Sequence, residues 1–360
     1  MRFKRIVSLC CAAMMTMGGM QSALSVQAAG FHVRGDVNAD GVVGIADAVV
    51  LQKWLLGIPN TTLQNWDAAN LCKDAELDVS DFTCMKRMIL NPQPSVEITS
   101  PYSCKAAALA CIEDEEILYA DHIDTRVAPA SLTKLLTASA ALQHLSPDTV
   151  ITVGTEQQLV KPHSSLCLIK AGHKLKLCDL LMGMLIASGN DAAYTVAVAA
   201  ARADQPDVTL SDSQAVTHFS EMMNQYAIEI GMKNSHFVNP EGWDDSDQYT
   251  TVSDLLILAK HAYSIPEIKA ITGIYQKKVY FVSGENVTWT NTNSLLNPNS
   301  EYYCADAVGI KTGSTSNAGK CLIAAVRHEE KTYLSVVTGC ATDSDRYALT
   351  LKILSAFGIR

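Results

Sequence analysis

The sequence lacks the features of several protein classes. No block of Lys or Arg occurs in its interior, and 37 acidic residues outnumber 28 Lys and Arg to give a net charge of −9. Affinity based on neutralising phosphates is therefore not expected, and we predict no nucleic-acid partner. Aromatic residues make up only 6% of the 360, but 48% are hydrophobic and 18% charged. This is the composition of a folded chain.

Long apolar runs are also missing. Beyond residue 28 no stretch reaches the roughly 18 consecutive apolar residues that span a bilayer, so we expect no transmembrane span in the mature chain. Residues 1–28 have a basic start, an apolar stretch at 6–20 and a small-residue cleavage site at 26–28. This pattern indicates a secretory signal peptide, with a retained signal anchor as the alternative. We therefore expect a secreted, extracellular protein.

No Cys-x-x-Cys pair occurs, which argues against zinc or thioredoxin-like chemistry. Two of the eleven cysteines, Cys10 and Cys11, fall in the signal, so an odd number is left in the mature chain. At least one thiol is then unpaired. In an exported protein we expect some of the others to form disulfides, whose connectivity the sequence leaves open.

A proline-rich stretch without periodicity at residues 91–102 indicates a linker. It separates two candidate domains, 30–90 and 103–360. The smaller one contains a repeat. Its first copy places oxygen-bearing groups at positions 1, 3, 5, 7 and 12 of a loop, with Gly41 for the turn, and an amphipathic helix follows. This is the pattern of a calcium loop, with ligands Asp36, Asn38, Asp40, the Val42 carbonyl and Asp47.

The second copy follows 34 residues later and is less regular. Its candidate ligands are Asn70, Asp74 and Asp81. Cys72 stands where Asn or Asp is usual, and Ala75 replaces the glycine. The duplicated loop and helix resemble a dockerin, a small all-α calcium-binding module that docks secreted proteins onto cohesin domains of a scaffold. The resemblance implies Ca²⁺ and a cohesin-bearing partner, with surface attachment through the scaffold. We hypothesise that Cys72 and Cys84 form a disulfide that stabilises the second loop.

The larger segment alternates between strand and helix patterns. A hairpin is predicted from two apolar runs, 106–112 and 117–120, around an acidic turn. Helices, then strands, then one more helix follow, which predicts an α+β domain with a sheet covered by helices. The predicted helices are 131–144, 175–202 with a break at 188–191, 213–230 and 344–357, and the predicted strands are 278–282, 307–311, 320–326 and 333–337.

Three short motifs carry the candidate chemistry. Ser131 and Lys134 lie three residues apart at a helix start, so both side chains share one face. A serine needs an adjacent base, and a lysine serves as one when its pKa is lowered. Ser188-Gly-Asn190 occupies the break in the second helical region, and Lys311-Thr-Gly-Ser-Thr315 ends a predicted strand. Each motif alone has an ordinary structural explanation; the three in this order and spacing do not.

Together these motifs resemble the active-site serine penicillin-recognising enzymes. The surrounding segments, at 129–134, 187–193, 293–296 and 308–322, are similar to the D-alanyl-D-alanine carboxypeptidases among the low-molecular-mass penicillin-binding proteins. The resemblance covers 103–360 and implies a transpeptidase fold like that of serine β-lactamases, an antiparallel sheet covered by helices with a helical subdomain. The C-terminal β-domain and membrane-binding helix of many members find no counterpart before Arg360, so anchoring of that kind is not expected.

The resemblance implies a role for each motif residue. Ser131 would attack the penultimate D-Ala carbonyl of a peptidoglycan stem peptide, Lys134 would be the general base, and Ser188 would relay a proton. Asn190 would hold the substrate amide. Backbone N–H groups of Ser131 and Ser314 would form the oxyanion hole, no cofactor would be needed, and β-lactams would acylate the serine. The terminal carboxylate would be bound by Lys311 and Thr312, with Gly313 and Thr315 in the same strand segment.

Two alternative functions remain open. A serine β-lactamase shares the three motifs, but the class A enzymes use a further glutamate for deacylation, and no matching E-x-x-L-N segment is found. The other alternative is a catalytically silent wall-binding module. Glu241 and the nearby Asp244, Asp245 and Asp247 could suggest a metal cluster; we expect instead an exposed loop.

Overall fold

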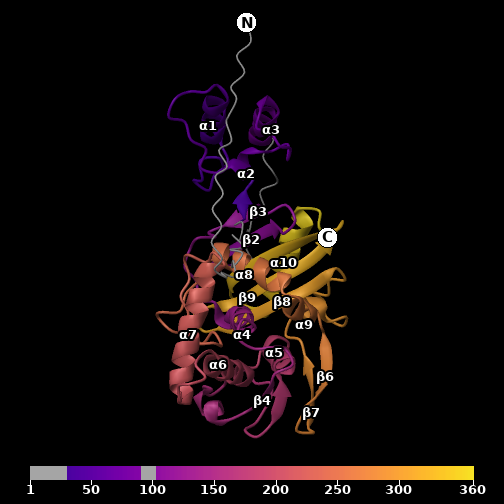
Figure 1. Cartoon of the computed structure of the whole chain (residues 1–360). Coiled ribbons are helices and arrows are strands. Elements are labelled where there is room, and N and C mark those ends of the chain that lie inside the picture. Colours follow the sequence, from indigo (N-terminus) through magenta and orange to yellow (C-terminus); the bar gives the residue numbers. More distant parts are fainter. Residues whose placement is uncertain (1–30, 91–102) are drawn as a thin grey trace.

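The computed structural model describes residues 31–90 and 103–360 (Figure 1). The predicted signal peptide and linker lie outside the described residues. The N-terminal domain packs two antiparallel helical elements against each other, α1 (Ile45–Leu55) and α3 (Val79–Leu90), with the single turn α2 (Trp66–Ala69) between them. Their shared core contains Val37, Leu51 and Met85, all fully buried. Each of the two helices follows one of the repeated loops, as the sequence pattern predicts.

The larger domain is built on a six-stranded sheet. Its strand order is β1-β3-β2-β10-β9-β8. All neighbours pair antiparallel except β1, which runs parallel to β3. The strands are β1 (His32–Val33), β2 (Ala106–Cys111), β3 (Glu116–Asp121), β8 (Ala307–Thr315), β9 (Gly319–His328) and β10 (Lys331–Cys340).

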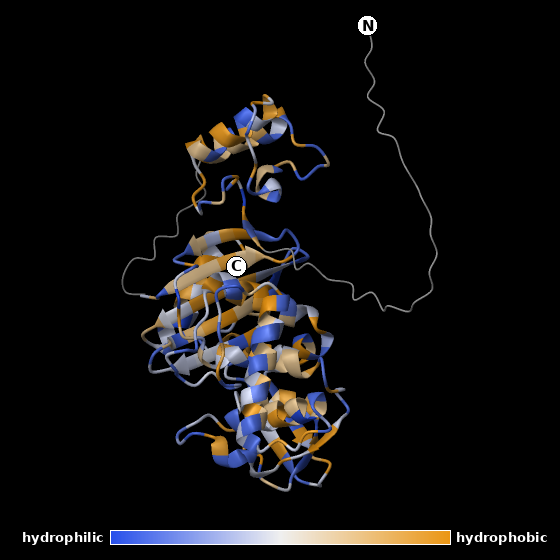
Figure 2. Ribbon diagram, turned by 60° about the vertical axis from the view of Figure 1, so that its left-hand side comes forward, coloured by the Kyte–Doolittle hydropathy of each residue, from blue (hydrophilic) through white to orange (hydrophobic). Residues whose placement is uncertain are grey.

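Both faces of this sheet are covered. Alternate residues of β2 enter different cores: Ala108 and Ala110 face one, and Leu109 faces the other. Strands buried on both sides read as continuous apolar runs, which is why β2 and residues 321–326 of β9 are wholly apolar. Figure 2 shows hydrophobic residues along the strands of the sheet. The C-terminal helix α10 (Asp343–Ala356) packs on β10 and β9 and covers the second face.

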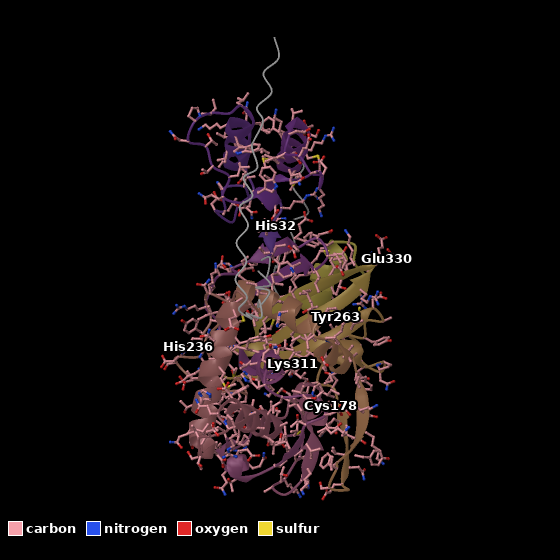
Figure 3. The ribbon with its side chains drawn as sticks, viewed as in Figure 1. His32, Cys178, His236, Tyr263, Lys311 and Glu330 are labelled. Atoms are coloured by element: carbon pink, nitrogen blue, oxygen red, sulfur yellow. The ribbon has the colours of Figure 1, made fainter. Side chains whose placement is uncertain are left out.

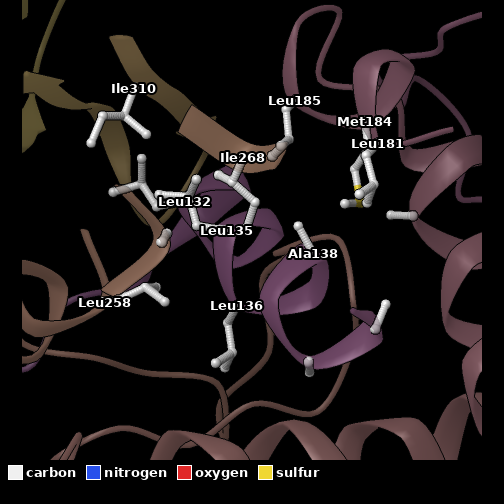
Figure 4. Close-up of a cluster of buried hydrophobic side chains, with 14 of the residues drawn as sticks. Leu132, Leu135, Leu136, Ala138, Leu181, Met184, Leu185, Leu258, Ile268 and Ile310 are labelled. Carbon is white, nitrogen blue, oxygen red and sulfur yellow. The ribbon is translucent and has the colours of Figure 1, made fainter. Parts of the chain in front are cut away.

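The helical part covers the first face and extends away from it (Figure 1). Helix α4 lies at its centre, and its buried leucines meet residues of α5, α8 and α9 in Figure 4. The helices are α4 (Thr133–Ala141), α5 (Leu177–Leu185), α6 (Asn190–Asp204), α7 (Asp212–Glu229), α8 (Val252–Ser264) and α9 (Pro266–Thr272). Short 3₁₀ turns lie at Ala130–Leu132, Thr155–Leu159 and Ser294–Leu296. Two small antiparallel pairs complete this part, β4 (Val150–Thr152) with β5 (Lys174–Lys176) and β6 (Gln276–Tyr280) with β7 (Asn286–Thr290).

Most predicted elements are present, with three differences. The predicted helix at 131–144 begins as the 3₁₀ turn Ala130–Leu132 and its α-helical part ends at Ala141. The predicted strand at 307–311 continues to Thr315, because its pairing with β9 runs through the Lys-Thr-Gly motif. Helices α2, α8 and α9 and strands β1, β4, β5 and β7 were not predicted. None of the helices in the two described ranges is both long and apolar enough to cross a membrane.

The two domains are in contact through a small strand. His32 and Val33 form β1, which extends the sheet edge at β3, and the His32 N–H donates to the Glu115 carbonyl. Figure 3 labels His32 at this junction. Arg34 contacts the buried carboxylate of Glu116 at 3.2 Å, and Lys73 contacts the same carboxylate at 3.5 Å. The N-terminal domain thus pairs with part of one edge of the six-stranded sheet.

Candidate active site

Ser131 and Lys134 are placed by the junction of a 3₁₀ turn with α4. Three-residue spacing on this helical segment brings the Lys134 Nζ to 2.8 Å from the Ser131 Oγ. The same amine donates to the Glu241 carbonyl at 2.9 Å. Ser131 is partly exposed, whereas Lys134 is fully buried. The pair therefore joins a reachable hydroxyl to an amine shielded from water.

Burial changes the acid–base behaviour of Lys134. Loss of water around the charged form lowers the pKa of Lys134 to about 8, and the negative charges of Glu241 and Asp191 oppose this shift. A lysine with its ordinary pKa is protonated at neutral pH and cannot accept a proton. The lowered pKa makes this amine a usable base for the Ser131 hydroxyl.

Ser188 and Lys311 form a second hydroxyl–amine pair. The Lys311 Nζ, on β8, donates to the Ser188 Oγ at 2.9 Å and to the Thr312 carbonyl. Ser188 sits between α5 and α6 with a φ of +59°, a conformation unusual for a residue with a side chain. Burial lowers the pKa of Lys311 well below its ordinary value, and Lys134 and Arg346 add to the effect. Figure 3 labels Lys311 where the sheet meets the helical part.

Asn190 opens α6, and the next residue holds the facing loop. The Asn190 N–H donates to the Ser165 carbonyl at 2.8 Å. The Asp191 carboxylate accepts from the N–H groups of Cys167 and Ile169. These bonds fix the 163–169 segment against the start of α6. Asn190 itself is buried to all but 6% and lines the pocket described below.

The end of β8 passes very close to the turn that carries Ser131. A Cβ on Gly313 would lie 3.1 Å from the Ala130 Cβ, so a larger residue would push strand and turn apart. The Gly313 carbonyl accepts from Arg346 of α10. Ser314 is exposed at this edge, and the Thr315 hydroxyl donates to Asp244. The Lys-Thr-Gly motif therefore lies directly beside the nucleophile.

Gly242 makes an even closer approach to the same turn. It has a φ of +91°, and a Cβ at this position would lie 1.8 Å from the Ala130 carbonyl oxygen. Asn239 accepts hydrogen bonds from the N–H groups of Gly242 and Trp243, which holds the loop in place. Only glycine combines this backbone angle with this contact.

A pocket of about 290 Å³ opens above Ser131. Of the sequence-predicted residues, Ser131, Asn190, Ser314 and Thr315 line it, whereas Lys134, Ser188, Lys311 and Thr312 do not. The Thr312 hydroxyl faces Thr292 instead. The remaining lining residues are His163, Ser164 and Ser165, the segment from Glu241 to Asp244, and Ser316 directly after β8.

Glu241 is the functional candidate that the sequence analysis missed. It was expected in an exposed loop, but it is 1% exposed and lines the pocket. Its carboxylate accepts from the Tyr194 hydroxyl at 3.0 Å. Asp244, expected in the same loop, accepts from Thr315 and from the Asn317 N–H. The only signal in the sequence is that Glu241 directly precedes Gly242, and the structure shows that this glycine packs against the turn that carries Ser131.

The first calcium-type loop has the expected backbone path. The Asp36 carboxylate accepts from the N–H groups of Asp40 and Gly41, and Asp47 accepts from those of Val37, Asn38 and Gly44. Asp47 is fully buried at position 12. In the described ranges, no three His, Cys, Asp or Glu side chains converge as a ready metal centre. The loop's oxygen donors and its glycine nevertheless suit a hard cation such as Ca²⁺.

The second loop repeats this arrangement with weaker elements. Asp81, also fully buried, accepts from the Cys72 and Asp78 N–H groups, as Asp47 does in the first loop. The Asn70 side chain donates to the Asp74 carbonyl. Cys72 and Cys84 are both free thiols here, with their sulfur atoms 3.7 Å apart. Cys72, which lies beside Cys84, thus occupies the position that the candidate oxygen ligand Asn38 holds in the first loop.

Comparison with known proteins gives two family matches. The D-alanyl-D-alanine carboxypeptidase family, peptidase family S11, matches residues 95–342, and the dockerin type I domain matches residues 34–90. The chain is 28% identical to the D-alanyl-D-alanine carboxypeptidase DacF of Bacillus subtilis over 70% of its length, and 30% identical to DacA of Escherichia coli over 67%. It spans 61% and 57% of the lengths of those two relatives.

Solved structures agree. The Streptomyces K15 DD-transpeptidase is 27% identical, with a TM-score of 0.64 over 72% of this chain and 100% of its own. The ampicillin-bound penicillin-binding protein D2 of Listeria monocytogenes is also 27% identical, with a TM-score of 0.58 over 72% of this chain and 98% of its own. Both similarities fall on the larger domain's fold.

Proposed function

Because the chain belongs to the D-alanyl-D-alanine carboxypeptidase family and carries a type I dockerin domain at its N-terminus, we propose that it is a secreted serine D-Ala-D-Ala carboxypeptidase. Its substrate is the peptidoglycan stem peptide, from which it releases the terminal D-alanine through an acyl-enzyme. Its dockerin binds a cohesin on a cell-surface scaffold. The observation that carries the proposal is the 2.8 Å contact between the reachable Ser131 hydroxyl and the buried Lys134 amine.

Acylation begins at this pair. Lys134 accepts the Ser131 proton while the Oγ bonds to the penultimate carbonyl carbon. The backbone N–H groups of Ser131 and Ser314 stabilise the oxyanion, since both residues line the pocket. Ser188, bonded to Lys311, returns a proton to the amine of the departing D-alanine.

The remaining motif residues orient the substrate. Asn190 holds the stem-peptide amide from the pocket wall. Lys311, when protonated, attracts the terminal carboxylate, and Ser314 and Thr315 at the end of β8 line the pocket in which that carboxylate binds. Water then hydrolyses the acyl-enzyme. No metal or organic cofactor takes part in these steps.

The experiment that tests this function combines a peptide and a drug. We expect release of one D-alanine from a pentapeptide ending in D-Ala-D-Ala and, separately, a stable penicilloyl adduct on Ser131 by intact mass. Ser131→Ala should abolish both. Rapid penicillin hydrolysis without alanine release would make the protein a β-lactamase, and no reaction with either would leave a silent wall-binding module.

Calcium and cohesin binding form the second part of the proposal. The oxygen donors of the first loop, Asp36, Asn38, Asp40, the Val42 carbonyl and Asp47, would hold one Ca²⁺, and Asn70, Asp74 and Asp81 would hold a second more weakly. Deleting residues 30–90 should remove the protein from the cell surface. Unchanged surface retention of that truncated protein would refute the tethering role.

A further inference from the structure

The pocket wall from Glu241 to Asp244 carries side chains that suit a cation. Its four consecutive residues all line the pocket, and they supply two carboxyl groups and the indole of Trp243, which is 37% exposed. Carboxylates and aromatic faces are the groups that attract an ammonium ion in proteins. Among the described residues that line this pocket, none is a Lys or an Arg. This wall therefore favours a positive charge in the ligand.

Asp244 is held at the pocket by the end of β8. Its two carboxylate oxygens accept separately, Oδ1 from the Thr315 hydroxyl and Oδ2 from the Asn317 N–H at 3.0 Å. Each carboxylate oxygen has a second lone pair with which it can accept another hydrogen bond. The side chain is half-buried. It is thus fixed in place by the protein and can still accept from a donor on a ligand.

The loop backbone around Trp243 is fixed as well. The Asn239 side chain accepts from the N–H groups of Gly242 and Trp243. The buried Gln248 side chain donates to the Trp243 carbonyl at 3.2 Å. A site whose groups are already in position loses less conformational entropy when a ligand binds. These bonds therefore favour recognition by this loop.

Two buried oxygens at the same pocket have no partner. Oε2 of Glu241, which is 1% exposed, and Oδ1 of Asn190, which is 6% exposed, accept no hydrogen bond within the described ranges. Both residues line the pocket, and Tyr194 donates only to the other Glu241 oxygen, Oε1. A buried acceptor without a donor costs free energy. An ammonium group carries three N–H donors, so it suits a pocket with unpaired acceptors.

The Lys-Thr-Gly motif separates this wall from the buried lysine at a defined spacing. Lys311 and Thr315 lie in β8 in regular register with β9, and four residue steps along a strand cover about 13 Å. Lys311 at one end suits a carboxylate, and Asp244, bonded to Thr315 at the other, suits an ammonium. In an extended peptide, the terminal carboxylate and the amine of a lysine-like third residue from the C-terminus are about 10–13 Å apart. The two spacings agree.

We propose that Asp244, with Trp243 and Glu241, forms a subsite for a free side-chain ammonium group of the donor peptide. The inference rests on the proposed carboxypeptidase function and narrows its substrate to stem peptides whose third residue from the C-terminus is a diamino acid with an unmodified amine. This amine donates to Asp244 and to the unpaired Glu241 oxygen and lies against the Trp243 ring. A stem peptide whose amine is acylated, as in a cross-link between two stems, lacks the charge and is a poorer substrate.

The charge selectivity of this subsite is assigned to Asp244. Burial raises the pKa of Glu241, which favours its uncharged form, so Glu241 contributes an acceptor rather than a charge. Because Asp244 is half-buried, dissolved salt screens its attraction for the ammonium. The preference for a free amine should therefore shrink as the ionic strength rises.

The test compares two pentapeptides that end in Lys-D-Ala-D-Ala, one with a free lysine amine and one acetylated there. For the wild type, kcat/KM for D-alanine release should be at least about tenfold higher with the free amine, the scale of one charge-assisted hydrogen bond. Asp244→Asn keeps an acceptor for Thr315 but not the charge, so this ratio should fall to within about twofold, with kcat/KM for the acetylated peptide within about threefold of the wild type. A residue that only held the turn after β8 would affect both peptides equally.

Asp247→Asn is the matched control. Asp247 is an exposed acid of the same loop and does not line the pocket. Its substitution removes the same charge, so the wild-type ratio should be kept if the contact with Asp244 is local. If Asp244→Asn fails to fold, the wild-type enzyme still tests the spacing. A third residue whose amine follows one carbon instead of four should lose the preference over its own acetylated form.

Equal kcat/KM for the free and acetylated lysine peptides, an unchanged ratio in Asp244→Asn, or a lost ratio in Asp247→Asn would each overturn the inference. A full preference with the short side chain would overturn it too. Absence of alanine release from every peptide, together with absence of a penicilloyl adduct, would instead refute the proposed function.

Discussion

At the scale of single residues, the site depends on how far water is kept from Lys134. The amine is fully buried, and its pKa falls to about 8 for that reason. Since only the neutral amine accepts the Ser131 proton, the acylation rate should rise with pH on the acid side, reach half its maximum near the pKa of about 8, and level off above about pH 9. Stopped-flow acylation by a chromogenic β-lactam measures this profile. A rate that still rises tenfold per pH unit above about pH 9 would indicate an ordinary lysine.

A second residue-scale prediction concerns glycines with similar backbone angles and different neighbours. Gly242→Ala introduces both strain and a clash with the Ala130 carbonyl, so acylation at Ser131 should fall sharply and unfolding free energy should drop by more than the about 1–3 kcal/mol of strain alone. Gly284 has a φ of +107° with nothing within 4 Å of a Cβ. Gly284→Ala should cost only the strain and acylate normally; equal effects of the two substitutions would contradict this account.

The sequence analysis proposed the motif residues of the site but missed other residues that line its pocket. Ser131 and Lys134 follow from spacing on a helix, which local rules describe well. Glu241 does not, because its role depends on a contact with Tyr194, 47 residues away in sequence. Nothing in one sequence shows that a loop carboxylate will be buried. The same applies to Thr312, whose hydroxyl faces Thr292 rather than the pocket.

At the scale of elements, Cys72 in the loop of the second dockerin repeat lies beside Cys84 of α3. Their sulfur atoms are 3.7 Å apart, so a small rotation brings them to bonding distance. Oxidation should form this disulfide and stabilise the repeat by about 3 kcal/mol, the value for a loop of this size. Intact mass before and after reduction, with thermal unfolding of both forms, checks it. Cys84→Ser should remove the difference, and a purified protein with two free thiols there would contradict it.

The elements that were predicted share strong local patterns. Helix α7 and the strands β9 and β10 have long periodic or continuous apolar runs, and their observed bounds differ from the predicted ones by a few residues. Helices α8 and α9 were missed although Thr251 caps the first and Pro266 opens the second. Only one residue separates the two helices, and their apolar residues pack against several other helices and strands. As a result, neither helix has one apolar face with a clear helical period.

At the scale of the whole molecule, calcium loading should affect the catalytic sheet. Asp36 follows β1 by only three residues, so ordering the first loop also orders the strand that pairs with β3. Removal of Ca²⁺ by a chelator should therefore speed hydrogen exchange in residues 31–36 and 113–121, with β9 unchanged. Equal exchange with and without Ca²⁺ would show that the contact forms independently of the metal.

The domain contact itself was outside the reach of the sequence analysis. The repeat and the linker pattern predicted two domains, but a two-residue strand such as β1 leaves no periodicity to detect. Arg34, Lys73 and Glu116 read as ordinary surface charges until the fold brings them within 3.5 Å. Contacts between residues so far apart in sequence depend on the three-dimensional fold, which neither the composition nor the spacing of residues reveals.

The six-stranded sheet has the two-residue strand β1 at one edge and β8, which reaches the pocket, at the other. Unpaired backbone groups on an exposed strand attract any extended chain, including a second copy of the same protein. Among the described residues, β8 is the long edge strand of this sheet to which another strand can add. Self-association and turnover would then compete for the same backbone groups, so a substrate-like peptide should act as a solubilising agent for this enzyme at high concentration.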